Sequence, residues 1–372
     1  MSKKIISLAA GVAMMGGAAM ADTPKVAADI GPVHSLVSRV MQGIGTPDLV
    51  VQAGASPHSY SLRPSEAKAL QEAQMIFWMG EGLSPWMEGA VDTLSSDATI
   101  ITLLERDETI LMEFREGALF EEHDHDDHAE HDDHGDEKHD DHKHDDHGDE
   151  KHDDHGDEKH DDHGDEKHDD HKHDDHGDEK HDDHSDEKHD EHEGHDDHGH
   201  GSHDPHAWLS PDNAKIWLNL IASELSIADP ENAGTYFANA AAGRVEIDAL
   251  KEEVSNLLEP VRGNKFIVFH DAYQYFEKTF DFNASGAISL TDASKPSPAR
   301  IAEIQARIQE ESIDCVLSEP QFNSGLVATV MAGSNAKTNV IDPLGVGLTL
   351  GPDLYFDLIR NMAKTLVECF ES

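Results

Sequence analysis

The sequence has few basic residues and few long apolar runs, and both shortages restrict its function. Against 77 acidic residues it has only 28 lysines and arginines, so nothing suggests a nucleic-acid partner or an anionic membrane surface. Apart from residues 5–18, no apolar run approaches the roughly 18 residues that a membrane-spanning helix needs. The phosphate-binding pattern G-x-x-x-x-G-K-[ST] is also absent. We therefore expect the chain to be neither a membrane permease nor an ATPase.

The first 21 residues are typical of a secretory signal peptide. Lys3 and Lys4 form a basic start, residues 5–18 are apolar and small, and residues 19–21 form an A-x-A cleavage site. Cleavage there leaves a mature chain that begins near Asp22. Because no cysteine directly follows this site, we expect a soluble periplasmic protein without a lipid anchor.

Cysteine is limited to two residues, Cys315 and Cys369. An even pair in an exported protein is typical of a disulfide. A bridge between them would contribute about 4 kcal/mol to stability in the chain-entropy model. Metal binding by the pair is the less favoured alternative, because the sequence has no C-x-x-C spacing.

A tract of histidine and acidic residues occupies residues 121–203. It holds 25 of the 29 histidines, 39 of the 77 acidic residues and eight of the 28 basic ones, so it carries −31 of the net charge of −49. The unit HGDEKHDD recurs five times within it. The tract has too few apolar residues to bury surface, so we expect a disordered loop.

This tract is also expected to bind additional Zn²⁺ weakly, since flexible histidines can meet the ion in many arrangements. A solvated acidic spacer is the alternative interpretation. Buffering of zinc, delivery to a main site and sensing of occupancy all remain open as its role.

The rest of the chain alternates between strand and helix patterns, which predicts an α/β fold with parallel sheets and helices on both faces. An amphipathic pattern from Asp229 to about Leu258 predicts a helix of about 45 Å that joins two lobes. We expect an N-terminal lobe over residues 22–226 that includes the tract, a linking helix over 227–262 and a C-terminal lobe over 263–372. The expected strands are residues 25–30, 50–51, 75–79, 98–103, 266–269, 315–317 and 340–341. Expected helices follow Pro32, begin at Pro211 after the capping residue Ser210, and occupy 64–73, 84–95, 298–310 and 353–370.

Only four histidines lie outside the tract, so few imidazoles are available for a metal site in the folded body. His58 follows an expected strand across a Gly/Pro loop, His206 lies in a turn before a helix, and His270 ends an expected strand. Asp342 ends another strand. Ligands of open α/β sheets bind beyond the carboxyl ends of strands, so these residues predict a metal site in the interlobe cleft. For any one of these histidines alone, a hydrogen-bonded loop residue would be the simpler interpretation.

Other polar residues near these positions receive no function. His34 lies near a helix start and is expected to be an ordinary helix-terminus histidine. Asp204, Asp271 and Glu319 could orient ligand imidazoles from behind, but turn and capping roles are favoured for them.

The proposed ligand set also indicates the metal. Three neutral imidazoles with one oxygen favour tetrahedral Zn²⁺. A set richer in carboxylates would favour Mn²⁺, while Ni²⁺ and Cu²⁺ could bind in vitro.

Several motifs, in order along the chain, resemble one protein family. They are GASPHSYSLRPS (54–65), DPHAWLSP (204–211), VFHDAYQYFE (268–277), LSEPQF (317–322) and IDPLG (341–345). Together they closely resemble the metal-binding lipoprotein-like, cluster 9 family of ABC transporter substrate-binding proteins, and most nearly its zinc-specific ZnuA type. The resemblance covers nearly all of the mature chain outside the tract.

The resemblance implies two α/β lobes joined by one long helix, with the metal at their interface and pairing of the two cysteines in the C-terminal lobe. It implies His58, His206 and His270 as ligands. Manganese members have a glutamate at the third position, so His270 favours zinc. Some zinc members have a glutamate directly after the first ligand, where this chain has Ser59. The fourth position is therefore open to Asp342, to water or to a tract histidine.

Three functions are consistent with these features. In the first, a monomeric binding protein delivers zinc to an inner-membrane ABC permease and, through it, to an ATPase. In the second, the chain is a zinc hydrolase, but no H-E-x-x-H motif and no nucleophile–base pair supports it. In the third, the chain stores zinc on its tract. We favour the first and do not expect an enzyme.

Overall fold

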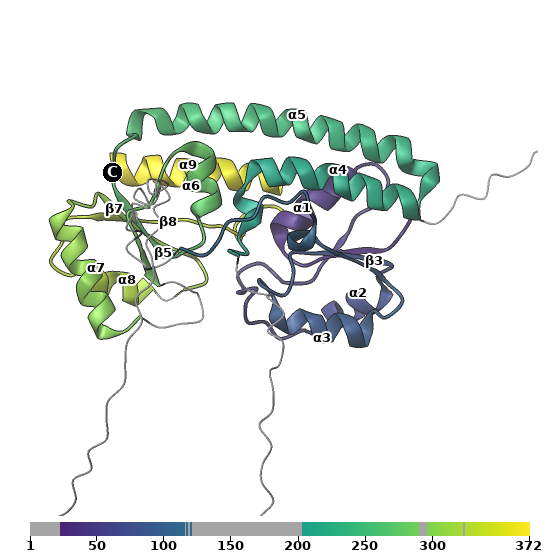
Figure 1. Ribbon diagram of the computed structural model, residues 1–372, viewed down its shortest axis with the longest axis horizontal. Coiled ribbons are helices and arrows are strands. Elements are labelled where there is room, and N and C mark those ends of the chain that lie inside the picture. Colours follow the sequence, from purple (N-terminus) through teal and green to yellow (C-terminus); the bar gives the residue numbers. More distant parts are fainter. Residues whose placement is uncertain (1–22, 116, 118–119, 121–202, 290–295, 323) are drawn as a thin grey trace, which may run out of the picture. The chain divides into compact units, whose positions relative to one another are not determined.

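Two four-stranded parallel sheets form the framework of the chain (Figure 1). The computed structural model describes residues 23–115, 117, 120, 203–289, 296–322 and 324–372. The first sheet has the order β2-β1-β3-β4 and the second the order β6-β5-β7-β8. Their strands are β1 (Val26–Ala28), β2 (Asp48–Leu49), β3 (Met75–Trp78), β4 (Thr99–Thr102), β5 (Phe266–His270), β6 (Ala287–Ser289), β7 (Cys315–Ser318) and β8 (Lys337–Val340). The predicted α/β fold with two lobes is confirmed.

Helices cover both faces of each sheet, as the alternating pattern predicts. They are α1 (Gly31–Val40), α2 (Pro64–Glu72), α3 (Pro85–Leu94), α4 (Pro211–Ala228), α5 (Ala233–Leu258), α6 (Gln274–Phe280), α7 (Pro298–Glu310), α8 (Ser324–Val330) and α9 (Leu354–Glu371). Among the described residues, none of these helices is long and apolar enough to cross a membrane.

Some sequence predictions fall outside this description. The signal peptide of residues 1–21 and nearly all of the tract of residues 121–203 lie outside the described residues. The described residues all belong to one compact unit. The expected boundaries of the two lobes and the linking helix stay predictions.

The central strands show why the sheets are parallel and buried. In β1, β3, β5 and β7 every residue is buried, which is typical of parallel strands covered on both faces. Alternate side chains point to opposite faces. Phe77 and Val268 therefore contribute to one hydrophobic core that contains residues of both sheets. Ile76 and Ile267, one residue away, contribute to two separate cores under α2–α3 and α7–α8.

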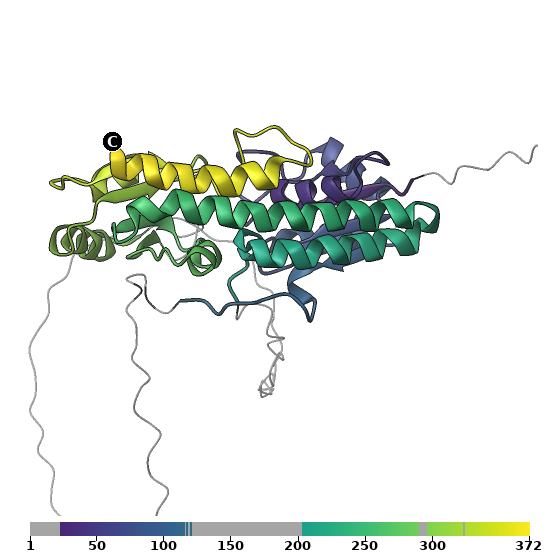
Figure 2. The same cartoon turned by 90° about the horizontal axis from the view of Figure 1, so that it is seen from above.

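One face of helix α5 lines the core that both sheets share. Its buried face repeats at helical spacing and includes Tyr236, Ala240, Ile247, Leu250 and Val254. It packs against α1 and α4 from the first lobe and against α9 from the second, and Figure 2 shows α5 beside α9 over much of its length. The long helix predicted to join the lobes is present, although a short 3-10 turn precedes it at Pro230–Asn232.

The sequence pattern predicts two edge strands at shifted positions and does not predict two short α-helices and one short strand. β2 and β8 begin and end earlier than expected, because their exposed residues interrupt the apolar signal. The expected residues still continue the pairing, since the Val51 amide donates to the Asp29 carbonyl and the Ile341 amide to the Ser318 carbonyl. The missed elements are α6, β6 and α8, each with seven or fewer residues.

A disulfide joins Cys315 on β7 to Cys369 on α9, as expected. Their Cα atoms are 6.0 Å apart and both side chains are buried. The bond attaches the last helix to a central strand of the second sheet.

Removal of this disulfide by the double substitution Cys315→Ala and Cys369→Ala should lower the free energy of unfolding by about 4 kcal/mol, because the unfolded chain regains a long loop. Urea unfolding followed by circular dichroism measures the change. Wild-type protein unfolded with a reductant should then resemble the variant. Equal stability of the oxidised wild type and the variant would contradict this role.

Candidate metal centre

Three imidazoles, from His58, His206 and His270, meet in the described part of the chain. One ring nitrogen of each lies within 4.8 Å of the others. His58 lies in the loop between β2 and α2, His206 directly precedes the short helix before α4, and His270 is the last residue of β5. The three histidines expected as ligands are therefore brought together from both lobes.

Strand order explains how one carboxylate reaches this group. β5 and β7 are neighbours in the second sheet and run parallel, so their carboxyl ends meet at one edge. His270 ends β5, and Glu319 directly follows β7. The Glu319 Oε1 atom lies 2.6 Å from the Nδ1 atom of His270.

A second carboxylate holds His206. The Oδ1 atom of Asp204 lies 2.6 Å from Nδ1 of His206 and also accepts its backbone N–H at 2.9 Å. Gln274 donates to the other oxygen, Oδ2, at 2.6 Å. Burial alone would raise the pKa of Asp204, but its contacts with His206 and the hydrogen bond from Gln274 hold that pKa below its usual range. The carboxylate therefore stays ionised behind the imidazole.

These carboxylates determine which ring nitrogens can bind a metal. An ionised carboxylate accepts a hydrogen bond, so Nδ1 of His206 and of His270 each carry the proton. The neutral rings then present lone pairs at Nε2. These two Nε2 atoms lie 3.3 Å apart. Two lone pairs that face each other at this distance repel, unless a cation or a proton lies between them.

The spacing of these nitrogens matches tetrahedral coordination. Nitrogen ligands lie about 2.0–2.1 Å from Zn²⁺, which places two of them about 3.3–3.4 Å apart at tetrahedral angles. The observed Nε2–Nε2 distance of 3.3 Å agrees with this value.

His58 approaches the other two rings from a loop held by α3 and the residue before it. Ser84 Oγ and the indole N–H of Trp86 donate to the carbonyl of Pro57 at 3.1 and 2.7 Å. The rings of His58 and His206 have centroids 5.4 Å apart. His58 is half-buried, whereas His206 and His270 are buried. It therefore marks the side on which the group is most open.

Two other residues considered from the sequence lie apart from this group. The carboxylate of Asp342 accepts backbone N–H groups of Leu344, Gly345 and Val346 at 2.5–3.0 Å, and Asp342 is not among the clustered ligand atoms. Its role as fourth ligand stays a prediction. His34 is buried within α1, where its Nε2 lies 3.0 Å from the Pro47 carbonyl and burial lowers its pKa.

Asp271 belongs to a buried network of ion pairs. Like Asp204 and Glu319, it receives no function from the sequence. The guanidinium of Arg115 contacts both Asp271 and Glu277. Burial raises the pKa of each carboxyl group, and Arg115 opposes this rise. Burial alone would lower the pKa of Arg115, but the two carboxylates raise it above its usual value. Nothing in the sequence pairs Arg115 with residues more than 150 positions later.

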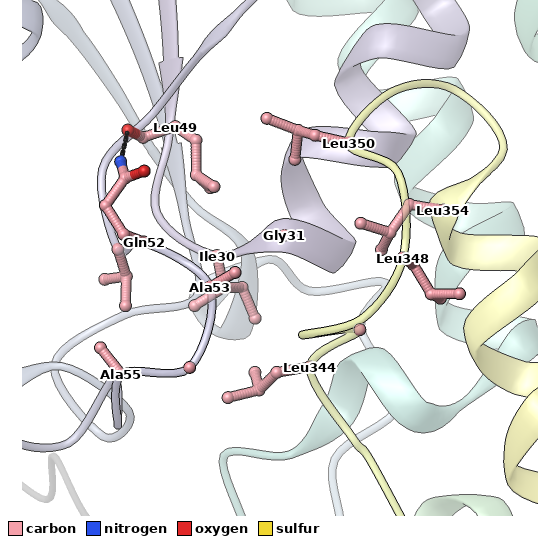
Figure 3. A pocket seen from close by; sticks show the side chains of 13 residues that line it. Ile30, Gly31, Leu49, Gln52, Ala53, Ala55, Leu344, Leu348, Leu350 and Leu354 are labelled. Carbon is pink, nitrogen blue, oxygen red and sulfur yellow. Dashed lines mark hydrogen bonds between the residues drawn. The ribbon is translucent and has the colours of Figure 1, made fainter. Parts of the chain in front are cut away.

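A separate pocket of about 240 Å³ contains none of the three histidines (Figure 3). Leu49 and Ala55 line it from the first lobe, and Leu344, Leu348 and Leu354 line it from the second. Its lining is mainly aliphatic, so it offers no metal ligands.

Replacement of Glu319 by glutamine should raise the dissociation constant for Zn²⁺ by about 10–100-fold, because a neutral partner makes the His270 ring a weaker base. Competition with a chelating dye measures the constant. Glu253→Gln, on α5 and paired with Arg360, is the matched control and should leave the constant unchanged. An E319Q constant within two-fold of wild type would contradict this orienting role.

Comparison with known proteins relates this geometry to a family. Residues 26–369 match the family described as "Zinc-uptake complex component A periplasmic". The High-affinity zinc uptake system protein ZnuA of Brucella abortus is 42% identical over 354 residues, which cover 95% of this chain and 94% of that protein. The protein of the same name from Paracoccus denitrificans is 40% identical over 369 residues, which cover 99% of this chain and 98% of that protein.

A solved structure shares the fold. The structure described as "Crystal structure of ZnuA" superposes with a TM-score of 0.63 at 19% identity, covering 94% of this chain and 99% of that one. The chain belongs to the family of periplasmic zinc-uptake complex component A proteins.

Proposed function

We propose that this chain binds one Zn²⁺ in the periplasm and delivers it to an inner-membrane ABC permease, which an ATPase drives. His58, His206 and His270 provide the protein ligands. The observation that carries this proposal is the pair of Nε2 atoms 3.3 Å apart, each on a ring whose Nδ1 faces a carboxylate. Membership of the zinc-uptake family supports the transport role.

The donor set favours zinc over harder ions. Three imidazoles in a tetrahedral arrangement suit Zn²⁺, whereas Mn²⁺ prefers more oxygen ligands. Because neutral imidazole is the ligand, protons compete with the ion and acid favours release.

Water is the simplest fourth ligand for this site. The Asp342 carboxylate already accepts three backbone N–H groups, two at Oδ1 and one at Oδ2, so about one of its four lone-pair positions is left for an ion. Asp342 is the alternative fourth ligand, through the remaining lone pair of Oδ2.

The chain acts in transport and not in catalysis. We further propose that it is a monomer without a lipid anchor, that it binds no nucleic acid, and that the tract adds weak zinc sites of its own. We also propose that the first lobe comprises residues 22–226, the linking helix residues 227–262 and the second lobe residues 263–372.

Isothermal titration of four proteins with Zn²⁺ tests this function. The wild type and a variant lacking residues 123–196 should both bind one ion tightly, because all three ligands lie outside the deleted segment. His206→Ala should lose tight binding, since no ring replaces its nitrogen. His34→Gln, outside the group, is the control and should bind like wild type.

Loss of tight binding on deletion of residues 123–196 would favour a storage protein instead. Tight one-to-one binding by His206→Ala would also contradict the proposal, because it would place the ion elsewhere.

A further inference from the structure

The two chain segments that lead into and out of the tract form a neck, defined as residues 110–115 and 203–204. Glu113 and His203 pair as an antiparallel bridge, and the Asp204 amide donates to the Met112 carbonyl at 2.8 Å. Asn213 of α4 bonds both backbone groups of Ile110, at 2.8 and 2.9 Å. Through the two Ile110 bonds to Asn213 of α4, the neck is attached to the first lobe.

Helix α6 of the second lobe bonds the same neck. The Tyr275 hydroxyl accepts the Met112 amide at 2.9 Å and donates to the Asp204 carbonyl at 2.8 Å. The side-chain amide of Gln274 donates to the Glu113 carbonyl at 3.0 Å and to Asp204 Oδ2. The carboxylate that orients His206 is thus held partly by the other lobe.

Arg115 provides the charged part of this attachment. It bonds Glu277 through two nitrogens at 2.8 and 3.1 Å, and its Nε donates to the two Asp271 oxygens at 2.9 and 3.1 Å. Both carboxylates are buried. The ring of Phe120 covers the guanidinium at 3.5 Å. A planar fork that bonds two buried carboxylates at once is a geometry that lysine cannot reproduce.

These contacts connect the neck to both buried imidazoles. Asp204, two residues before His206, is bonded to Met112 within the neck and to Gln274 of α6, while Asp271 directly follows His270. His206 is joined to the first lobe through α4, and His270 ends a strand of the second lobe. A shift of the neck relative to α6 would change the distance between their Nε2 atoms.

We propose that Arg115 is a positioning residue of the metal centre, which fastens the neck to the second lobe and holds His206 and His270 at the spacing that one ion requires. This inference rests on the proposed zinc-binding function. Removal of the guanidinium leaves two buried carboxylates without their cation, so the neck detaches from α6 and a bound zinc ion dissociates faster. The three histidine ligands are still present in such a variant.

The test measures the zinc dissociation rate of the full chain after mixing with excess chelator. Arg115→Met should raise this rate at least ten-fold, and Arg115→Lys should give a smaller increase because it keeps the charge but loses the fork. Arg106→Met, which removes an arginine paired with Glu224 on α4, is the matched control and should stay within two-fold of wild type. The visible absorption of the Co²⁺-loaded protein should change in Arg115→Met and not in the control.

A double variant separates positioning from folding. Arg115→Met with Glu277→Gln removes one uncompensated charge, so its apo melting temperature should recover toward wild type while zinc dissociation stays fast. Recovery of the dissociation rate together with the melting temperature would overturn the proposal, as would wild-type dissociation and an unchanged Co²⁺ spectrum in Arg115→Met. If the methionine variant fails to fold, a wild-type dissociation rate in Arg115→Lys overturns it equally.

Measuring His206→Ala beside these variants also tests the proposed function. His206→Ala must lose tight zinc binding for the function to stand. If it does so while Arg115→Met behaves as wild type, only the role of Arg115 fails.

Discussion

Two carboxylate–imidazole hydrogen bonds determine the direction of the lone pairs at the metal centre. Asp204 and Glu319 each bind an Nδ1 atom, so the opposite nitrogens of His206 and His270 face each other. Without these carboxylates either ring could change tautomer or rotate. A cation between the two Nε2 atoms would remove the repulsion between their lone pairs, because each lone pair would then be donated to the ion. Under the proposed function, this arrangement would favour a small ion that prefers nitrogen ligands.

The framework keeps this arrangement rigid while dividing it between two lobes. His270 and Glu319 are fixed by neighbouring parallel strands, whereas His206 enters from the segment before α4. Helix α5 packs against elements of both lobes within one continuous core, so large separation of the lobes would expose apolar surface. A small shift at the lobe interface would act directly on the distance between the Nε2 atoms of His206 and His270.

Much of the fold and the three central histidines could be predicted from the sequence. The four central strands are apolar runs that parallel sheets require, and Ser210-Pro211 marks the start of α4, where the Ser210 side chain accepts the Asn213 amide. His58 and His270 were found because they follow strand patterns, at the edge where α/β proteins bind ligands. The resemblance to a metal-binding family agreed with this choice.

The partners of these histidines could not be predicted in the same way. Glu319 reaches His270 only because β7 lies next to β5, and strand order is not visible in a single sequence. Arg115 and Glu277 are 162 positions apart, so their contact depends on the finished fold. Asp342 follows a strand, as a ligand would, and its oxygens accept amides of its own turn, so its role as fourth ligand stays a prediction.

X-ray absorption at the zinc edge, on the full chain loaded with one equivalent of Zn²⁺, tests the central claim most directly. The account predicts a shell of three imidazole nitrogens at about 2.0–2.1 Å with one oxygen. A shell with fewer than two imidazoles, or six oxygen ligands at longer distance, would show that the ion is bound by other groups and would contradict the account.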